Sequence, residues 1–393
     1  MLPVTDHFSY DYFGSDLVFG RGVVADLGDR LADRGRDRAL VVCGSNVGAN
    51  DAVMDPVRDG LADRLVGVFD ETTPAKSAET VFAGIDRVRV DDPDVLVGLG
   101  GGSSLDIARQ ISAFAADGRS LGDLREAART GPIDPPSGPA ALPVAVIPTT
   151  FAGADLSGGG SIEVLSAADS PTGDPVRVGG HTMPELGVYD PDLFETTPMS
   201  ALRGSAMNGF NKGIETVYAA DPTPVTDATA VHGLRLLRAA LPRLDDPAAM
   251  DRAVAGVLLV QFQRRTAIVH AVGHGFSYRY DVQQGAVHAA VVPHVLEYVF
   301  DHVDARRALL AAGLGIDPAG RSEAEIAAAI VASVTELRDE LGLPARLRDL
   351  GPTREADLPD IARFVRDDPT IERSPPGLDP SVEDIEAVLR AAW

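Results

Sequence analysis

Lysine is rare in this chain, and one of its two lysines lies in a segment whose pattern predicts a helix. Of 35 basic residues, only Lys76 and Lys212 are lysines. Lys212 belongs to SAMNGFNKGIETVYAADP (205–222) and follows Asn208 by four residues. A fixed ammonium can stabilise negative charge that develops on a carbonyl oxygen, and it can donate a proton when burial lowers its pKa. Because arginine replaces lysine almost everywhere else, we interpret Lys212 as a functional residue and not as an incidental helix lysine.

Histidines provide the second candidate site. Four of the eight histidines fall in HAVGHGFSYRYDVQQGAVHAAVVPH (270–294). His270 and His274 are four residues apart, so they share one face of a predicted helix. Such a pair can take part in metal binding, although zinc or iron needs three or four ligands. We interpret both as functional, and the alternative is a pair of ordinary core or surface histidines.

A glycine-rich turn provides the third candidate site. In VGLGGGSSLDIAR (97–109) a buried-strand pattern ends in Gly100, Gly101 and Gly102, and Ser103 opens a predicted helix. Glycines allow a phosphate to approach the backbone closely, and the free N–H groups of a helix start attract an anion. The spacing matches neither the G-x-G-x-x-G fingerprint nor a P-loop. Its place after a strand favours a nucleotide site over a simple tight connection.

Two adjacent threonines follow another strand-like run. Thr149 and Thr150 lie in PTTFAGADLS (148–157). Their hydroxyl groups can hydrogen-bond a nucleotide, and the alternative is an ordinary polar loop. We treat the pair as a second candidate part of the nucleotide site.

The first part of the chain alternates between short apolar runs and amphipathic segments. The runs are rich in β-branched residues and have the length of buried strands, at 38–44, 64–70, 94–100 and 143–150. Alternation of this kind predicts a parallel sheet with helices packed on its faces. We assign residues 1–165 to this α/β domain.

From about residue 199 the pattern changes to long segments rich in Ala and Leu with apolar residues at helical spacing. The intervening segment 166–190 is rich in Pro, Gly and Asp, which predicts a linker. We therefore expect an all-helical domain over residues 191–393.

Composition limits the classes of function. The formal net charge is −23, and the acidic residues are scattered along the whole length. This composition, with Arg in place of Lys, is typical of a protein adapted to high salt, and it excludes nucleic acid as a partner. A single cysteine, Cys43, rules out an internal disulfide and favours a reducing compartment. Neither a signal-peptide pattern nor an apolar stretch of roughly 20 residues is present, so we expect a cytoplasmic protein without a membrane partner.

In combination, these segments resemble the iron-containing alcohol dehydrogenase superfamily. The similar stretches follow the family's order and span most of the chain: FGRGVVADLGDRL, GGGSSLDIAR, PTTFAGADLS, YDPDLFETTP, residues 205–222 and PHVLEY. The resemblance implies a Rossmann-like parallel-sheet nucleotide-binding domain followed by an all-helical domain, the fold shared with dehydroquinate synthase. It also implies a homodimer and an NAD or NADP cofactor that binds at the glycine turn, with Asp106, Thr149 and Thr150 in support. Gly44 and Ser45 follow the strand where NAD-specific members often carry an acidic residue, so an NADP phosphate would not be repelled.

In the metal-dependent members, one Asp and three His bind iron or zinc, which polarises the substrate oxygen. The matching positions here are Asn208, Lys212, His270 and Gln284. Asn and Gln are weak neutral ligands, and a lysine ammonium cannot bind a metal before it loses its proton. The resemblance therefore implies that this chain has lost the metal, and we expect no metal cofactor.

Within the superfamily the chain is most similar to the maleylacetate reductases, which work without metal. The similar stretches are PTTFAGADLS, AMNG, ETVYAADPTPV and VHAAVVPH. That branch commonly keeps histidine at the positions of Lys212 and Gln284, so the resemblance does not identify maleylacetate itself as the substrate.

We therefore predict a metal-independent, NAD(P)-dependent reductase of a small carbonyl compound that carries a carboxylate, such as a maleylacetate-like oxo acid. We expect the catalytic groups to be Lys212, His270, His274 and Asn208. Arg279 and Gln284 are the candidates for substrate binding. Two alternatives are a lyase or cyclase of the dehydroquinate synthase type, which recycles its bound NAD, and a nucleotide-binding protein whose active site has decayed.

Overall fold

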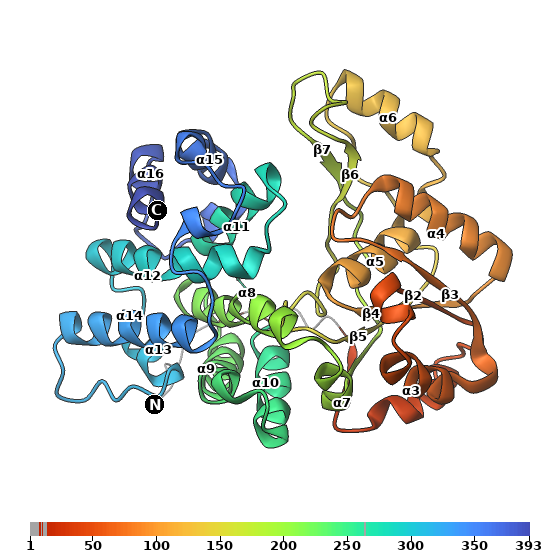
Figure 1. The fold of residues 1–393 in the computed structure, drawn as a ribbon, viewed down its shortest axis with the longest axis horizontal. Helices are drawn as coiled ribbons and strands as arrows, with labels where there is room; N and C mark the ends of the chain where they lie inside the picture. The colour runs from red at the N-terminus through yellow and green to blue at the C-terminus, as the bar shows by residue number, and fades with distance from the viewer. Residues whose placement is uncertain (1–7, 9, 11–13, 263–264) are drawn as a thin grey trace. The chain divides into compact units, whose positions relative to one another are not determined.

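The computed structural model describes residues 8, 10, 14–262 and 265–393. The chain forms two compact units (Figure 1). One is the α/β unit, which in the described part runs from residue 14 to Thr150 and from Ala154 to Thr197. The other is the helical unit, which contains Phe151–Gly153 and Pro198–Trp393. In the part of the chain that the structure describes, no helix combines the length and apolar character that a membrane span requires.

A six-stranded sheet forms the centre of the α/β unit, and all of its strands are parallel. In spatial order its strands are β1 (Asp16–Phe19), β8 (Leu186–Tyr189), β5 (Val144–Pro148), β4 (Val95–Gly100), β2 (Ala39–Gly44) and β3 (Leu65–Thr72). The four strands predicted from apolar runs are confirmed within two residues at each end. The predicted parallel α/β architecture is therefore confirmed.

Both faces of this sheet are buried, because alternate residues of each strand enter different cores. Leu40 and Val42 pack into one core, whereas Val41 and Cys43 pack into the other. Helices cover each face and supply the rest of these cores. The helices of this unit are α1 (Leu27–Ala32), α2 (Ser45–Gly48), α3 (Asp51–Leu61), α4 (Ala78–Asp91), α5 (Gly102–Asp117), α6 (Leu121–Thr130) and α7 (Pro191–Glu195).

Residues 166–190, which the sequence analysis assigns to a linker, contain parts of two sheets. β7 (Val176–Val178) pairs with β6 (Ile162–Leu165) in an antiparallel ribbon, and β8 lies between β5 and β1 in the main sheet. The compact unit accordingly continues through Thr197. β8 is a buried strand of four residues flanked by turn-forming residues, so its local pattern resembles that of a loop.

The helical unit begins with the 20-residue helix α8 (Met199–Tyr218), which is buried along most of its length. The other helices are α9 (Pro224–Ala240), α10 (Pro247–Leu259), α11 (Ile268–Arg279), α12 (Gln284–His302), α13 (Arg307–Gly313), α14 (Glu323–Glu340), α15 (Leu358–Asp367) and α16 (Val382–Ala391). α8 packs against α9 and α12, and α11 packs against α12 and α15. The predicted all-helical C-terminal region is therefore confirmed, although residues 191–197 belong to the α/β unit.

Glycines set how closely α8 approaches its neighbours. A Cβ at Gly285, near the start of α12, would collide with the backbone of Gly204 on α8. A Cβ at Gly213 would lie 2.7 Å from the Leu234 side chain on α9. Because these positions have no side chain, the start of α12 lies directly against α8. This approach places Gln284 opposite Asn208.

Candidate active site

The glycine turn lies where the order of the parallel strands reverses. From β2 the chain adds β3 on one side, and it then returns past β2 to add β4, β5 and β8 on the other side. β2 ends at Gly44 and β4 ends at Gly100, so two glycine-ended strands meet at this reversal. Ligands of open α/β sheets bind at the carboxyl ends of strands at such a point.

The start of α5 has the features that a dinucleotide phosphate requires. Gly100 has φ of +121°, which a residue with a side chain rarely adopts, and Gly101 is the N-cap of the helix. Side chains cap α3, α4 and α6, whereas no side chain caps α5. The first bond of the helix runs from the N–H of Ser104 to the carbonyl of Gly101 at 3.0 Å, so the N–H groups of Gly102 and Ser103 precede it and favour an anion. The residues of this turn therefore fit a dinucleotide.

The structure brings several of the predicted cofactor residues together. A Cβ at Gly101 would lie 3.5 Å from the Thr150 side chain, and Ser103 is half-buried in the first turn of α5. Thr149 is buried, and its N–H donates to the carbonyl of Gly100 at 3.0 Å. Thr149 therefore supports the turn through its backbone, while Thr150 lies beside the glycines.

Asp106, the fifth residue of α5, belongs to a charged cluster in the α/β unit. Its carboxylate accepts hydrogen bonds from Lys76 Nζ at 3.1 Å and from Arg109 at 2.8 Å. Arg109 is fully buried and also donates to the carbonyl groups of Ala154 and Asp155, at 2.7 and 2.8 Å. Sequence reasoning did not connect Lys76 with this site, although the rarity of lysine was a signal for it.

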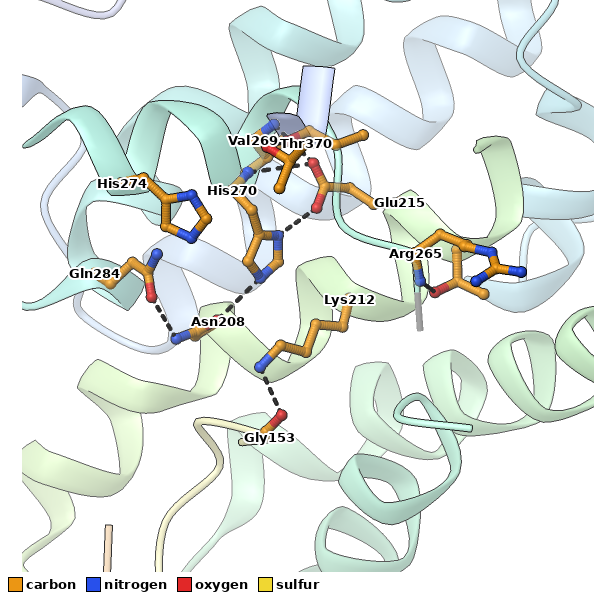
Figure 2. A network of polar contacts seen from close by, with 12 residues as sticks. Gly153, Asn208, Lys212, Glu215, Arg265, Val269, His270, His274, Gln284 and Thr370 are labelled. Atoms are coloured by element: carbon orange, nitrogen blue, oxygen red, sulfur yellow. Dashed lines mark hydrogen bonds and ion pairs between the residues drawn. The ribbon is translucent and has the colours of Figure 1, made fainter. Parts of the chain in front are cut away.

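In the helical unit, four polar side chains form one hydrogen-bonded row (Figure 2). Asn208 and Glu215 lie on one face of α8, since residues seven apart are two turns apart. His270 on α11 contacts Glu215 through Nδ1, and its Nε2 lies 3.1 Å from Asn208 Oδ1. Asn208 Nδ2 then donates to Gln284 Oε1 at 3.1 Å. Three of the predicted site residues are thus brought together with a fourth that was not predicted.

Glu215 is the residue that sequence reasoning missed. It is fully buried, accepts hydrogen bonds from the N–H groups of Val269 and His270 at 2.7 and 3.3 Å, and contacts the His270 ring. Burial raises the pKa of Glu215 to about 7, against the opposing effect of these backbone hydrogen bonds. The available signal was that Glu215 is the only acidic residue of the stretch 205–220.

Lys212 lies in this region and is almost fully buried. Its ammonium donates to the carbonyl oxygens of Ala152 and Gly153, each at 2.6 Å. Gly153 has φ of +65°, and a Cβ there would lie 3.3 Å from Nζ, so glycine allows this close approach. At least two of the three N–H bonds of Lys212 are therefore used, and these two hold residues 152–153.

The side chains at the four positions that match the family's metal ligands do not fit a divalent metal. At the four positions that match the family's ligands, the two amides are hydrogen-bonded to each other, one group is an imidazole and one is a lysine that donates to carbonyls. A lysine ammonium repels a cation and offers it no lone pair. Across the described residues, no group of three or more His, Cys, Asp and Glu side chains could hold a metal ion.

His274 lies one turn beyond His270 on α11, and its side chain is 43% exposed. Its Nδ1 lies 2.8 Å from Asp368 Oδ2. Although burial acts to raise the pKa of Asp368, hydrogen bonds from His274 and Thr370 hold that pKa at about 2. His274 is thus a partly exposed imidazole that is oriented by a carboxylate, and it lies near the polar row, as Figure 2 shows.

Arg279 binds a carboxylate, but one that belongs to this chain. Its guanidinium donates to Asp357 at 2.9 Å, and Tyr280 and Arg354 donate to the same carboxylate. Nine residues separate His270 from Arg279 on α11, about 13 Å at 1.5 Å per residue. The structure therefore gives Arg279 a role in holding the chain together, and its contacts do not favour the predicted role in substrate binding.

His288, on α12, is buried against His270, with ring centroids 4.5 Å apart. Burial lowers its pKa well below the ordinary value, so it packs there as a neutral ring. A Cβ at Gly273 would collide with this ring, which explains the glycine between His270 and His274.

The chain thus combines a parallel sheet of the kind that binds nucleotides with a helical unit that carries a buried row of polar groups. The chain belongs to the iron-containing alcohol dehydrogenase family. Residues 14–191 match the family described as iron-containing alcohol dehydrogenase, and residues 204–393 match its C-terminal part. The predicted family membership is therefore confirmed.

Relatives match over nearly the whole chain. The chain is 26% identical to the NAD-dependent methanol dehydrogenase of Bacillus methanolicus over 385 residues, which cover 95% of this chain and 97% of the relative. It is 26% identical to maleylacetate reductase 1 of Cupriavidus pinatubonensis over 363 residues, 90% of this chain and 89% of the relative. The crystal structure of a 1,3-propanediol oxidoreductase shares the fold, with a TM-score of 0.85, 24% identity and coverage of 98% and 100%.

Proposed function

We propose that this protein is a metal-independent, NAD(P)-dependent reductase of a small carbonyl compound. The observation that carries the proposal is the set of side chains at the family's metal-ligand positions. Asn208, His270 and Gln284 form one hydrogen-bonded row, and Lys212 donates to two carbonyl groups. Hydrogen-bond donors and a fixed positive charge can take over the task of stabilising charge on the substrate oxygen.

The direction of the hydrogen bonds in the row indicates where the protons lie. Asn208 donates through Nδ2 to Gln284, so its Oδ1 accepts a hydrogen bond from His270 Nε2, which carries a proton. The contact between His270 Nδ1 and Glu215 then holds a second proton, shared between imidazole and carboxyl. When the Nε2 proton is given up, the ring keeps its Nδ1 proton and remains neutral beside the Glu215 carboxylate.

This arrangement suits the proton step of a carbonyl reduction. The nicotinamide, when bound, supplies the hydride that converts the carbonyl into an alkoxide. We propose that His270 Nε2 exchanges its hydrogen bond to Asn208 Oδ1 for one to the alkoxide oxygen and gives that oxygen its proton, while Asn208 Nδ2 orients the oxygen as a hydrogen-bond donor. Lys212 adds positive potential nearby, and it has at most one N–H to offer the substrate because two are donated to carbonyl groups.

The relatives guide the choice of cofactor and substrate. The methanol dehydrogenase relative is NAD-dependent, and two other relatives are maleylacetate reductases. Gly44 and Ser45 carry no charge at the end of β2, which is compatible with either NAD or NADP. We propose NAD(P)H as reductant and an oxo acid as substrate, with the cationic Lys212 as the group that favours an anionic ligand.

The test is a screen of oxo acids and simple aldehydes for oxidation of NADH and NADPH in molar KCl. The metal content is measured on the same preparation, and the assay is repeated after treatment with EDTA. We expect turnover with oxo acids, less than a tenth of an equivalent of iron or zinc, and no effect of EDTA. About one metal per chain, with activity lost to the chelator, would refute metal independence. A reaction that leaves the nicotinamide unchanged would instead favour the lyase alternative, and no turnover would favour a decayed site.

A further inference from the structure

Lys76, the second lysine of the chain, is held in an unusual conformation. It follows β3 and has φ of +51°, a left-handed conformation that is unfavourable for a residue with a side chain. Its N–H donates to the carbonyl of Thr73 at 3.2 Å, and its own carbonyl accepts the N–H of Glu163 at 3.0 Å. These two hydrogen bonds hold the backbone of Lys76 in this conformation, and the backbone sets the direction in which the side chain leaves it.

The Lys76 side chain reaches the first turns of α5. Lys76 Nζ lies 3.1 Å from Asp106 Oδ2. Asp106 and Gly102 are four residues apart on α5 and so share one face, and helical side chains point toward the N-terminus. The ammonium therefore lies on the face that begins with the glycine turn. Thr72, the last residue of β3, also contacts the start of α5, because its Oγ1 hydrogen-bonds Ser104 Oγ at 2.7 Å. The segment that leads to Lys76 is therefore held against the first turn of α5.

The charges of this cluster show what Lys76 adds. Arg109 lies in the field of two carboxylates, Asp106 and Asp155. Without Lys76 the formal charges of Arg109, Asp106 and Asp155 would sum to −1. This net negative charge would oppose the binding of a phosphate at the start of α5. With Lys76 the sum is zero. Arg109 is fully buried, whereas the Lys76 side chain is 29% exposed, so Lys76 is the cation of this cluster that an incoming ligand can contact.

We propose that Lys76 is a cofactor-binding residue whose ammonium contacts the pyrophosphate of the dinucleotide. This inference rests on the proposed function, since it assumes that the glycine turn binds NAD(P)H. Asp106 holds the ammonium on the face of α5 that begins with the glycine turn, and the backbone N–H groups of the turn supply further donors. The ligand class is therefore a dinucleotide, and Lys76 contacts its negatively charged diphosphate and not its bases.

The test compares binding of NADH, ADP-ribose and adenosine by calorimetry in the wild type, Lys76→Met and Lys76→Arg. We expect Lys76→Met to weaken NADH and ADP-ribose by about tenfold, as for loss of one charged hydrogen bond. Adenosine, which lacks phosphate, should bind as before. Lys76→Arg should recover part of the affinity. Raising the salt concentration should weaken NADH binding less in Lys76→Met than in the wild type, because a screened charge has been removed.

A matched control is Arg125→Met, which removes a partly exposed cation of the same unit that pairs with Glu79. Its NADH affinity should equal that of the wild type. If Lys76→Met unfolds, Lys76→Gln keeps a hydrogen-bond donor for Asp106 and is used in its place. Unchanged NADH affinity, or an equal loss for NADH and adenosine, would overturn the inference. A wild-type protein that binds neither NADH nor ADP-ribose would instead refute the proposed function itself.

Discussion

Replacement of Lys212 by methionine separates the structural role of this residue from its proposed catalytic role. Lys212 is buried, and its ammonium donates two hydrogen bonds of 2.6 Å to the carbonyl groups of Ala152 and Gly153. Lys212→Met keeps most of the volume but leaves both carbonyl oxygens without this donor. A hydrogen bond to a charged group contributes about 1.5–3 kcal/mol. Because two such bonds are lost, we expect the free energy of unfolding of the helical unit to fall by about 3 kcal/mol, the lower end of the range for two bonds. For a unit of this size, the melting temperature should fall by roughly 6–12 °C.

The catalytic prediction for the same variant is a fall in kcat of about 10²–10³, the loss typical of removing one donor to a developing oxyanion. Binding of NADH should change little, because Lys212 belongs to the helical unit and the glycine turn to the α/β unit. Thermal unfolding and single-turnover reduction, measured on one preparation at a temperature below the lowered transition, separate the two effects. Lys212→Arg should recover only part of kcat and only part of the stability, because a planar guanidinium cannot occupy the position of Nζ.

Asn211→Leu provides the matched control, because it changes the neighbouring residue of α8. Asn211 is fully buried, and within the described structure its amide atoms have no hydrogen-bond partner. Its replacement by a leucine of similar volume should therefore leave stability and kcat nearly unchanged. Near-normal kcat in Lys212→Met together with lowered stability would show that Lys212 only holds residues 152–153. Unchanged stability would refute the energetic reasoning.

Three further predictions test other parts of the molecule. Gly101→Val should abolish NAD(P)H binding in calorimetry while the melting temperature is retained, because the side chain enters the space beside Thr150; undiminished binding would show that the turn is not the cofactor site. Arg279→Met should leave KM for an oxo acid unchanged and lower stability by on the order of 1 kcal/mol. The bond from Arg279 is the largest cause that lowers the pKa of Asp357 to about 2, so in the wild type this stabilisation is present above about pH 4 and is lost as the pH falls through 2. In an acid titration the variant should therefore unfold at higher pH, and a raised KM would restore Arg279 to the substrate site. Finally, with a net charge of −23, the melting temperature should rise steeply from low salt to molar KCl, and a flat response would remove the case for adaptation to salt.

The elements that carry the candidate site follow from local pattern. Short apolar runs predict β2, β3, β4 and β5 because a strand buried on both faces needs consecutive apolar residues. The glycine turn is visible for a similar reason, since only glycine tolerates a φ such as that of Gly100. The spacing of Asn208 and Lys212 on one helix likewise follows from 3.6 residues per turn. Each of these conclusions depends on residues that are close in the sequence.

Strand β8 shows where local pattern is insufficient. Its four residues lie in a segment rich in Pro, Gly and Asp, which predicts a linker. Its place in the sheet depends on pairing with β1 and β5, which are far away in the sequence. Such pairing is favourable only when the rest of the sheet has formed, so no local signal specifies it.

The partners of the site residues were also decided by the tertiary structure. The sequence places Lys212 on a helix but does not show that its ammonium binds carbonyl groups about 60 residues earlier. It does not show that Arg279 binds Asp357, 78 residues later, or that Glu215 orients His270 across 55 residues. Periodicity determines which face of an element a side chain occupies, whereas its partner depends on how closely two elements approach. Here that approach depends on glycines such as Gly204 and Gly285, whose importance appears only once the helices are packed.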